Sequence, residues 1–356
     1  VNGHEYFHEK YTGFLLEHTH RFAGWTAGLL ATALAVAAWL SGPDKRSRLF
    51  GLLAVVALLA AYGWFHGQMM AAQKAREATG RFVFPTPSGV ATAVTAGLVL
   101  LAAAAHLFSR QSGKWVRAAA SVLLIAVMTQ GLLGGFRVFL DQSIGVTRTL
   151  GIELSATHGV FAQVVFSLMV LVPALSGPRT PGDTLGGDDR ARLRWLSLAL
   201  PAAVLVQLVW AVWVRHAPTP LTQRLHFLTA FVVLGLAVWL AVRARATADG
   251  RRLLGFGTAH LLLLLGVQIL LGVEAWMGKF AAAGPDALLP PELRPVTVSA
   301  GFIRTLHQLI GTMVLASSVV VAFRAWRSPL PAQPDGLTRD DRRPTASQYE
   351  PETVTS

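Results

Sequence analysis

The sequence contains no cysteine. Disulfide bonds, thiolate catalysis and iron–sulfur ligation by this chain are therefore excluded. Charged residues are also scarce, because Asp, Glu, Lys and Arg make up 14% of the 356 residues, whereas about a quarter is usual for a soluble domain. Hydrophobic residues make up 53%. This composition is typical of a membrane protein and not of a soluble globular one.

Runs of about 20 apolar residues recur along the chain, which is the length that a helix needs to cross a bilayer. Pro/Gly-rich or charged loops separate these runs. The sequence therefore predicts an all-α, polytopic membrane protein with about nine transmembrane helices. The expected spans are 22–40, 49–70, 88–108, 117–138, 153–174, 195–214, 225–242, 253–276 and 302–323.

The net charge of +12 does not indicate a nucleic-acid partner, because the Lys and Arg residues lie in loops between spans and form no separate basic domain. The loops expected inside carry the larger share of them, so the first span is expected to run from outside to inside a plasma membrane. The first 20 residues are polar and aromatic without an apolar core, and no signal peptide is therefore expected. The polar segment 327–356 is expected to be a disordered inner tail.

Histidines recur at or near the starts of four of the expected spans. The segment Glu17-His18-Thr19-His20-Arg21 precedes the first apolar run, and His158, His226 and His307 begin later ones. The expected topology places all four at the outer ends of their helices. Ionisable residues are costly in a membrane segment, so they favour a functional interpretation.

The order of motifs is repeated in two halves. Gln130-Gly-Leu-Leu-Gly-Gly135 precedes His158, and Gln268-Ile-Leu-Leu-Gly272 precedes His307. Each half also opens with a histidine near an arginine. The repeat predicts two pseudo-symmetric four-helix bundles in tandem, 1–175 and 195–326, joined by an inner linker at 176–194.

The two halves are expected to differ in length for two reasons. The segment 45–108 is interpreted as an insertion of two helices into the first half. The span that ends at His216, before His226, has no counterpart ahead of His20. A further helix ahead of residue 1 is therefore expected from the repeat.

Paired histidines on facing helices are suited to bind haem iron from its two sides. Nearby arginines can bind haem propionates, although interfacial arginines also extend toward water without a ligand; the candidates are Arg21, Arg137 and Arg224. Glu17 lies one turn before His20, so its carboxylate can bind, orient or deprotonate a group at the haem edge. It can equally be a helix-terminal acid or pair with Arg21. His66 and His216 are further candidate ligands.

Taken together, Glu17-x-x-His20-Arg21, the Gln-Gly-Leu-Leu-Gly-Gly run, His158, and the later set of Arg215, His216, His226, Gln268 and His307 resemble haem A synthase. The resemblance implies eight helices in two bundles, here without the first helix and with two inserted. It implies that haem O, the substrate, binds between His20 and His158, and that haem b binds between His226 and His307.

By the same resemblance, the C8 methyl of haem O becomes the formyl group of haem A through successive hydroxylations, and Glu17 is the catalytic residue. The implied partners are haem O synthase, an electron donor such as ferredoxin, membrane lipid and, in a homo-oligomer, further copies of the chain. Two alternatives remain. A di-haem electron-transfer protein of cytochrome b type needs the four histidines but not Glu17. A transporter would place its polar residues near the bilayer midplane.

Overall fold

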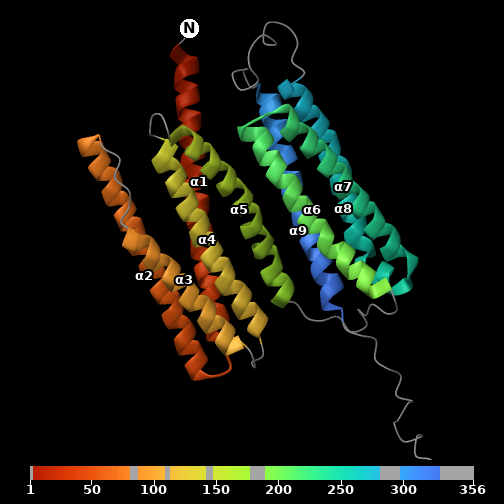
Figure 1. Ribbon diagram of the computed structural model, residues 1–356, viewed down its shortest axis with the longest axis horizontal. Helices are drawn as coiled ribbons and strands as arrows, with labels where there is room; N and C mark the ends of the chain where they lie inside the picture. Colours follow the sequence, from red (N-terminus) through yellow and green to blue (C-terminus); the bar gives the residue numbers. More distant parts are fainter. Residues whose placement is uncertain are drawn as a thin grey trace, which may run out of the picture.

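The computed structural model describes residues 3–80, 87–108, 113–141, 147–176, 189–280 and 297–328. These residues form nine α-helices and no strand (Figure 1). The helices are α1 (Gly3–Leu40), α2 (Lys45–Thr79), α3 (Pro87–Phe108), α4 (Lys114–Asp141), α5 (Thr147–Ser176), α6 (Asp189–His216), α7 (Pro220–Ala246), α8 (Ala248–Phe280) and α9 (Val298–Arg327). The all-α prediction is confirmed, whereas most of the linker and nearly all of the tail that the sequence predicted fall outside the described residues.

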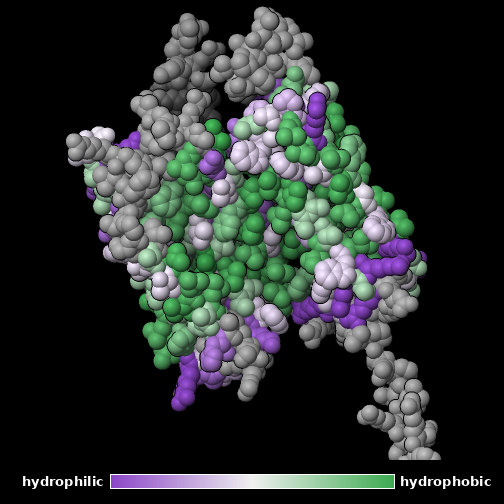
Figure 2. All heavy atoms as spheres, in the orientation of Figure 1, coloured by the Kyte–Doolittle hydropathy of each residue, from purple (hydrophilic) through white to green (hydrophobic). Residues whose placement is uncertain are grey.

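Eight of these helices are long and apolar enough to cross a membrane, and α3 contributes a shorter apolar stretch, Val94–Ala104. Large hydrophobic side chains such as Phe231, Phe256 and Leu270 are exposed on the helix surfaces. Figure 2 shows hydrophobic atoms across the middle of the visible face and hydrophilic atoms mainly toward its two ends. Lipid tails can cover such an apolar surface. Inside the bilayer, helices form all their backbone hydrogen bonds internally. The protein is a multi-pass membrane protein.

Consecutive helices run in opposite directions. The helices α1, α5, α7 and α9 begin at the upper end in Figure 1, and α3 begins beside the middle of α2. The others begin at the lower end. Several starts carry N-caps, in which a side-chain oxygen accepts a backbone N–H. Asp44 caps α2, Thr219 caps α7 and Thr297 caps α9. Gly80 ends α2 with a φ of 67°, the left-handed conformation that glycine adopts readily.

The second half is a closed bundle of four helices. Each of α6, α7, α8 and α9 packs against two of the others, through the pairs α6–α7, α7–α8, α8–α9 and α6–α9. Each helix contributes a fully buried leucine to one core, namely Leu200, Leu240, Leu261 and Leu315. The core runs from the lower end of the bundle to its middle, which leaves the upper ends of the helices to carry polar side chains.

In the first half, the packing of α1 on α4 and of α4 on α5 corresponds to that of α7 on α8 and of α8 on α9. The helix α2 packs against α1, α3 and α4, and α3 packs against α2 and α4. Trp39 of α1 is fully buried and donates a hydrogen bond from Nε1 to Ser121 of α4 at 3.2 Å. The Trp39 ring occupies the space beside Gly51 of α2, where a Cβ would overlap it. A glycine therefore allows α2 to approach α1 closely.

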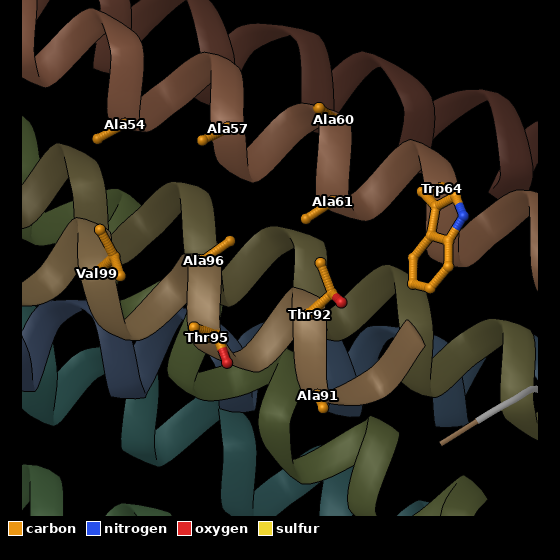
Figure 3. Close-up of a pocket in the computed structure, with 10 residues that line it drawn as sticks. All are labelled: Ala54, Ala57, Ala60, Ala61, Trp64, Ala91, Thr92, Thr95, Ala96 and Val99. Atoms are coloured by element: carbon orange, nitrogen blue, oxygen red, sulfur yellow. The ribbon is translucent and has the colours of Figure 1, made fainter. Parts of the chain in front are cut away.

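A groove of about 610 Å³ separates parts of α2 and α3 (Figure 3). Small side chains line it, including Ala54, Ala57 and Ala61 of α2 and Thr92 and Ala96 of α3. The small residues leave space between two helices that elsewhere touch.

The two halves meet through α5, which packs against α6 and α9. At the lower end, Arg327 of α9 donates a hydrogen bond to the carbonyl of Ala174 in α5 at 2.8 Å. Arg194 of α6 donates to the carbonyls of Ala325, Trp326 and Ser328. These carbonyls at the end of α9 lie where the helix itself supplies no further N–H groups, so arginine side chains cap the helix.

Candidate functional site

The second half holds a histidine between a glutamine and a glycine that lie one turn apart on α8. The Gln268 side-chain Nε2 lies 3.3 Å from His307 Nε2, and His307 Nδ1 lies 3.2 Å from the Gln268 backbone oxygen. A Cβ on Gly272 would lie 2.9 Å from His307 Cε1. Because real Cβ contacts are longer, only glycine lets α9 place its imidazole this close to α8.

The first half repeats this arrangement on α4 and α5. Gln130 Nε2 lies 3.3 Å from His158 Nε2 and donates a hydrogen bond to the His158 carbonyl at 3.0 Å. A Cβ on Gly134 would lie 3.0 Å from His158 Cε1. The Gln-x-x-x-Gly spacing is the same in both halves, and in both halves the Gln and the Gly contact an imidazole of the next helix. We call each arrangement a cradle: Gln130, Gly134 and His158 in one half, and Gln268, Gly272 and His307 in the other.

His20 of α1 faces the first cradle from a third helix. The centroids of the His20 and His158 rings are 6.3 Å apart, with an angle of 80° between the ring planes. Two imidazoles that bind one metal ion from opposite sides, with metal–nitrogen bonds of about 2 Å, have centroids about 6 Å apart. The centroid separation matches that distance, and His158 Nε2 itself faces the Gln130 amide.

His226 of α7 lies near the second cradle. It lies close enough to His307 for their charges to interact. Gln207 Nε2 of α6 lies 3.0 Å from His226 Nδ1, and Thr229 Oγ1 donates a short hydrogen bond to Gln207 Oε1. Because Gln207 engages Nδ1, the other ring nitrogen, Nε2, is the one left to bind a ligand.

The expected arginines differ in their surroundings. All three have exposed side chains, but only Arg137 of α4 lies close enough to His158 for their charges to interact. Arg215 of α6 donates to Gln308 Oε1 at 3.1 Å, beside His307 in the chain. Cations thus gather at the upper end near both cradles, where they can balance an anionic ligand.

Glu17 lies in α1, one turn before His20, and its side chain falls outside the described residues. The corresponding position of the second half, three residues before His226, is Gln223. Gln223 accepts a hydrogen bond from Trp276 Nε1 at 3.2 Å. The halves therefore differ at this position by one charge: a carboxylate precedes His20 and a neutral amide precedes His226.

The other two candidate histidines have different neighbours. His66 of α2 stacks on Tyr62, with centroids 6.5 Å apart and planes 2° apart. The Tyr62 hydroxyl lies beside Gly131, where a Cβ would be 2.8 Å from it. His216, at the end of α6, interacts electrostatically with Arg215, Arg137 and Lys279. The contacts of His66 and His216 thus place neither of them in a cradle.

Sequence reasoning used the glutamines as markers of a repeat and not as site residues. The structure brings Gln130 and Gln268 against the imidazoles, and it adds Gln207, for which no role was predicted. The available signal was the shared Gln-x-x-x-Gly spacing, because glycine one turn from a polar residue leaves room for a ring beside that residue.

The donor set is compatible with haem. Two imidazoles are few for a bare metal ion, but two is the number of axial positions that a haem iron offers. Three buried polar atoms of the cradles, His158 Nδ1, Gln130 Oε1 and Gln268 Oε1, make no hydrogen bond within the described part of the chain. Buried polar atoms without partners point to a missing ligand or water.

Comparison of the chain with protein-family models, with curated proteins and with solved structures gave no match. What the site can do therefore follows from its own residues, two imidazole pairs at the same end of two corresponding groups of helices.

Proposed function

We propose that this protein is a haem A synthase that oxidises the C8 methyl of haem O to a formyl group. The observation that carries the proposal is the repeated cradle, in which a Gln and a Gly of one helix hold the imidazole of the next helix. His20 faces the first of these imidazoles, and His226 lies near the second. Two equivalent axial sites in one membrane protein are what a substrate haem and a resident haem need.

In this proposal, haem O binds between His20 and His158, and haem b binds between His226 and His307. The assignment of the two sites rests on Glu17. A carboxylate stands three residues before His20 in the first half, whereas the amide Gln223 stands three residues before His226 in the second. A haem b in the second half would supply one-electron chemistry. Gln207 would fix the orientation of His226 from a closed bundle, which suits a cofactor that stays bound.

The residues of the first half have distinct roles. His20 and His158 hold and orient the substrate, and the cations nearby, Arg137 among them, balance its propionates. Glu17 acts on the methyl group that is oxidised. Its negative charge can stabilise positive charge that develops on the methyl carbon, or its carboxylate can take the proton of an incoming water.

A di-haem electron-transfer protein is the second candidate, and the same repeated cradle supports it. Such a protein would bind two haems of the same kind and release neither. The position of Glu17 separates the two functions, because an electron carrier needs no carboxylate at one site only.

The test is expression of the full chain in cells that make haem O but no haem A, followed by chromatography of the extracted haems. Wild-type protein should produce haem A, whereas His158→Ala should abolish it. Glu17→Gln should keep both haem spectra of the purified protein but slow haem A formation by at least about 10²-fold, the usual contribution of an acid–base group.

The matched control is Glu153→Gln, which neutralises an exposed carboxylate near the start of α5, at the same end of the molecule as Glu17. It should form haem A at the wild-type rate. Two bound haems b with no haem A in any variant would establish the electron-transfer function instead. Normal haem A formation by Glu17→Gln would remove the catalytic role of this residue.

A further inference from the structure

A second groove lies on the outer surface of the second half, between α8 and α9. It has a volume of about 230 Å³, and its lining includes Leu253, Phe256 and His260 of α8 and Ser317, Val320 and Arg324 of α9. Phe256 and His260 are exposed on the surface of the bundle. The groove is therefore open sideways, toward the lipid that surrounds a membrane helix.

A polar pair lies inside this mainly apolar groove. Ser317 Oγ lies 3.3 Å from His260 Nδ1, and the Phe256 ring stacks beside the imidazole, with centroids 6.3 Å apart and planes 11° apart. His260 and Ser317 belong to neither cradle. Gln268 and His307 lie farther along the same two helices, toward the upper end.

The pair lies deeper in the membrane than the charged residues of the lower end. His260 follows Arg252 by about 12 Å of helix, and Ser317 precedes Arg324 by about 10 Å, at 1.5 Å per residue. Both lie within apolar helices that can cross a bilayer. A histidine at this depth that faces lipid is costly, so it favours a binding role.

The pair can bind either oxidation state of a neutral ligand that carries a carbonyl or a hydroxyl group. When the Ser317 hydroxyl donates to His260 Nδ1, the ring carries its proton on Nε2 and can donate to a carbonyl. When Nδ1 donates to Ser317 instead, Nε2 can accept from a hydroxyl. Because the Ser317 hydroxyl can either donate or accept, it stabilises both neutral tautomers of the imidazole.

We propose that this groove binds the head group of a membrane quinol, with His260 Nε2 on one ring oxygen and Phe256 beside the ring. A quinol is neutral, reaches the groove sideways through lipid, and exchanges a hydroxyl for a carbonyl when it is oxidised. An anionic lipid head group would lie shallower, at the level of Arg324. A soluble donor such as ferredoxin would not reach a lipid-facing groove.

The role of the quinol rests on the proposed function. Oxidation of one quinol to a quinone releases two electrons and two protons. Each hydroxylation of the haem O methyl by O₂ consumes two electrons and two protons, inserts one oxygen atom and reduces the other to water. One quinol therefore balances one hydroxylation. His260 Nε2 accepts the first proton from the bound hydroxyl and becomes an imidazolium, and water at the lower end takes up the second proton.

Binding can be tested without any reaction. The purified full chain, in nanodiscs of zwitterionic lipid, is irradiated with a short-chain azidoquinone and the label is located by peptide mass spectrometry. The label should concentrate in 253–260 and 316–324, and unlabelled short-chain quinone should displace it. His260→Ala and Ser317→Ala should each lower the labelling about tenfold, the effect of one or two lost hydrogen bonds.

Two matched variants control for the substitutions. His106→Ala removes an exposed histidine near the lower end of α3, and Ser167→Ala removes a hydroxyl that donates to the Gln163 carbonyl within α5. Both should label as wild type does. Labelling that follows lipid exposure along all helices, or that an anionic phospholipid displaces, would overturn the quinol site.

A second measurement separates the site from the proposed function. Quinol is supplied as the sole reductant, and the conversion of haem O is followed in wild type and in His260→Ala. The variant should slow conversion about tenfold while dithionite-reduced haem spectra stay unchanged. Equal rates would overturn the role of the groove in electron supply. Specific labelling of a wild-type protein that makes no haem A would reject the synthase function and leave the quinol site standing.

Discussion

Two adjacent glycines of α4 provide a direct test of the cradle, because they differ only in what they face. A Cβ on Gly134 would lie 3.0 Å from His158 Cε1, whereas a Cβ on Gly135 would meet no atom within 4 Å. Ordinary contacts of a Cβ are 3.4–4 Å. Gly134→Ala must therefore displace the imidazole by a few tenths of an ångström. Gly135→Ala requires no such displacement.

The expected magnitude follows from the overlap. Overpacking of a filled site costs about 1–3 kcal/mol, which weakens haem binding in the first half about ten- to hundredfold if the displaced ring bears the whole cost. Alanine also favours the helix over glycine by about 1 kcal/mol. That gain is common to both variants, so their difference isolates the contact with His158.

The assay is the haem content of the purified protein, measured as the pyridine haemochrome per chain, with thermal unfolding in detergent as the control for folding. Gly134→Ala should lose haem from the first half and retain it in the second. Gly272→Ala should do the reverse, and Gly266→Ala, which meets no atom within 4 Å, should change neither. Equal haem contents for Gly134→Ala and Gly135→Ala would refute the cradle.

Three further predictions concern packing and orientation. Gly51→Ala would place a methyl group against the fully buried Trp39 ring, and it should lower the free energy of unfolding by about 1–3 kcal/mol, as measured by denaturation in mixed micelles. Arg194→Ala removes three hydrogen bonds to carbonyls at the end of α9, and it should cost about 1–3 kcal/mol, visible as faster hydrogen exchange in the last turn of α9. Gln207→Leu removes the partner of a histidine Nδ1, and it should weaken haem retention in the second half about ten- to hundredfold, as measured by haem transfer to apomyoglobin.

The sequence was sufficient to predict the helices. Each expected span lies within one observed helix, from 22–40 in α1 to 302–323 in α9. The reason is physical, because a bilayer requires long apolar helices whatever their partners are. The same logic placed His20 and His158 at one end of the molecule, where their rings lie close together.

The contacts between helices could not be predicted in the same way. Periodicity shows which face of a helix is apolar, but it does not show which neighbour that face meets. Gln207 on α6 therefore gave no sign that it would meet His226 on α7. Tyr62 likewise gave no sign that its hydroxyl would lie beside Gly131 of α4. The function of the site stays a prediction, because the residues make it possible and do not demonstrate it.

The single-residue difference between Glu17 and Gln223 has a consequence for how two such halves can specialise. A symmetric dimer of one four-helix unit would carry the same side chain at both positions, because each residue of an isologous pair appears twice. A change that helped one haem pocket would then be imposed on the other. Joining the two halves in one polypeptide removes that constraint, so that a carboxylate can be kept in one pocket and excluded from its twin.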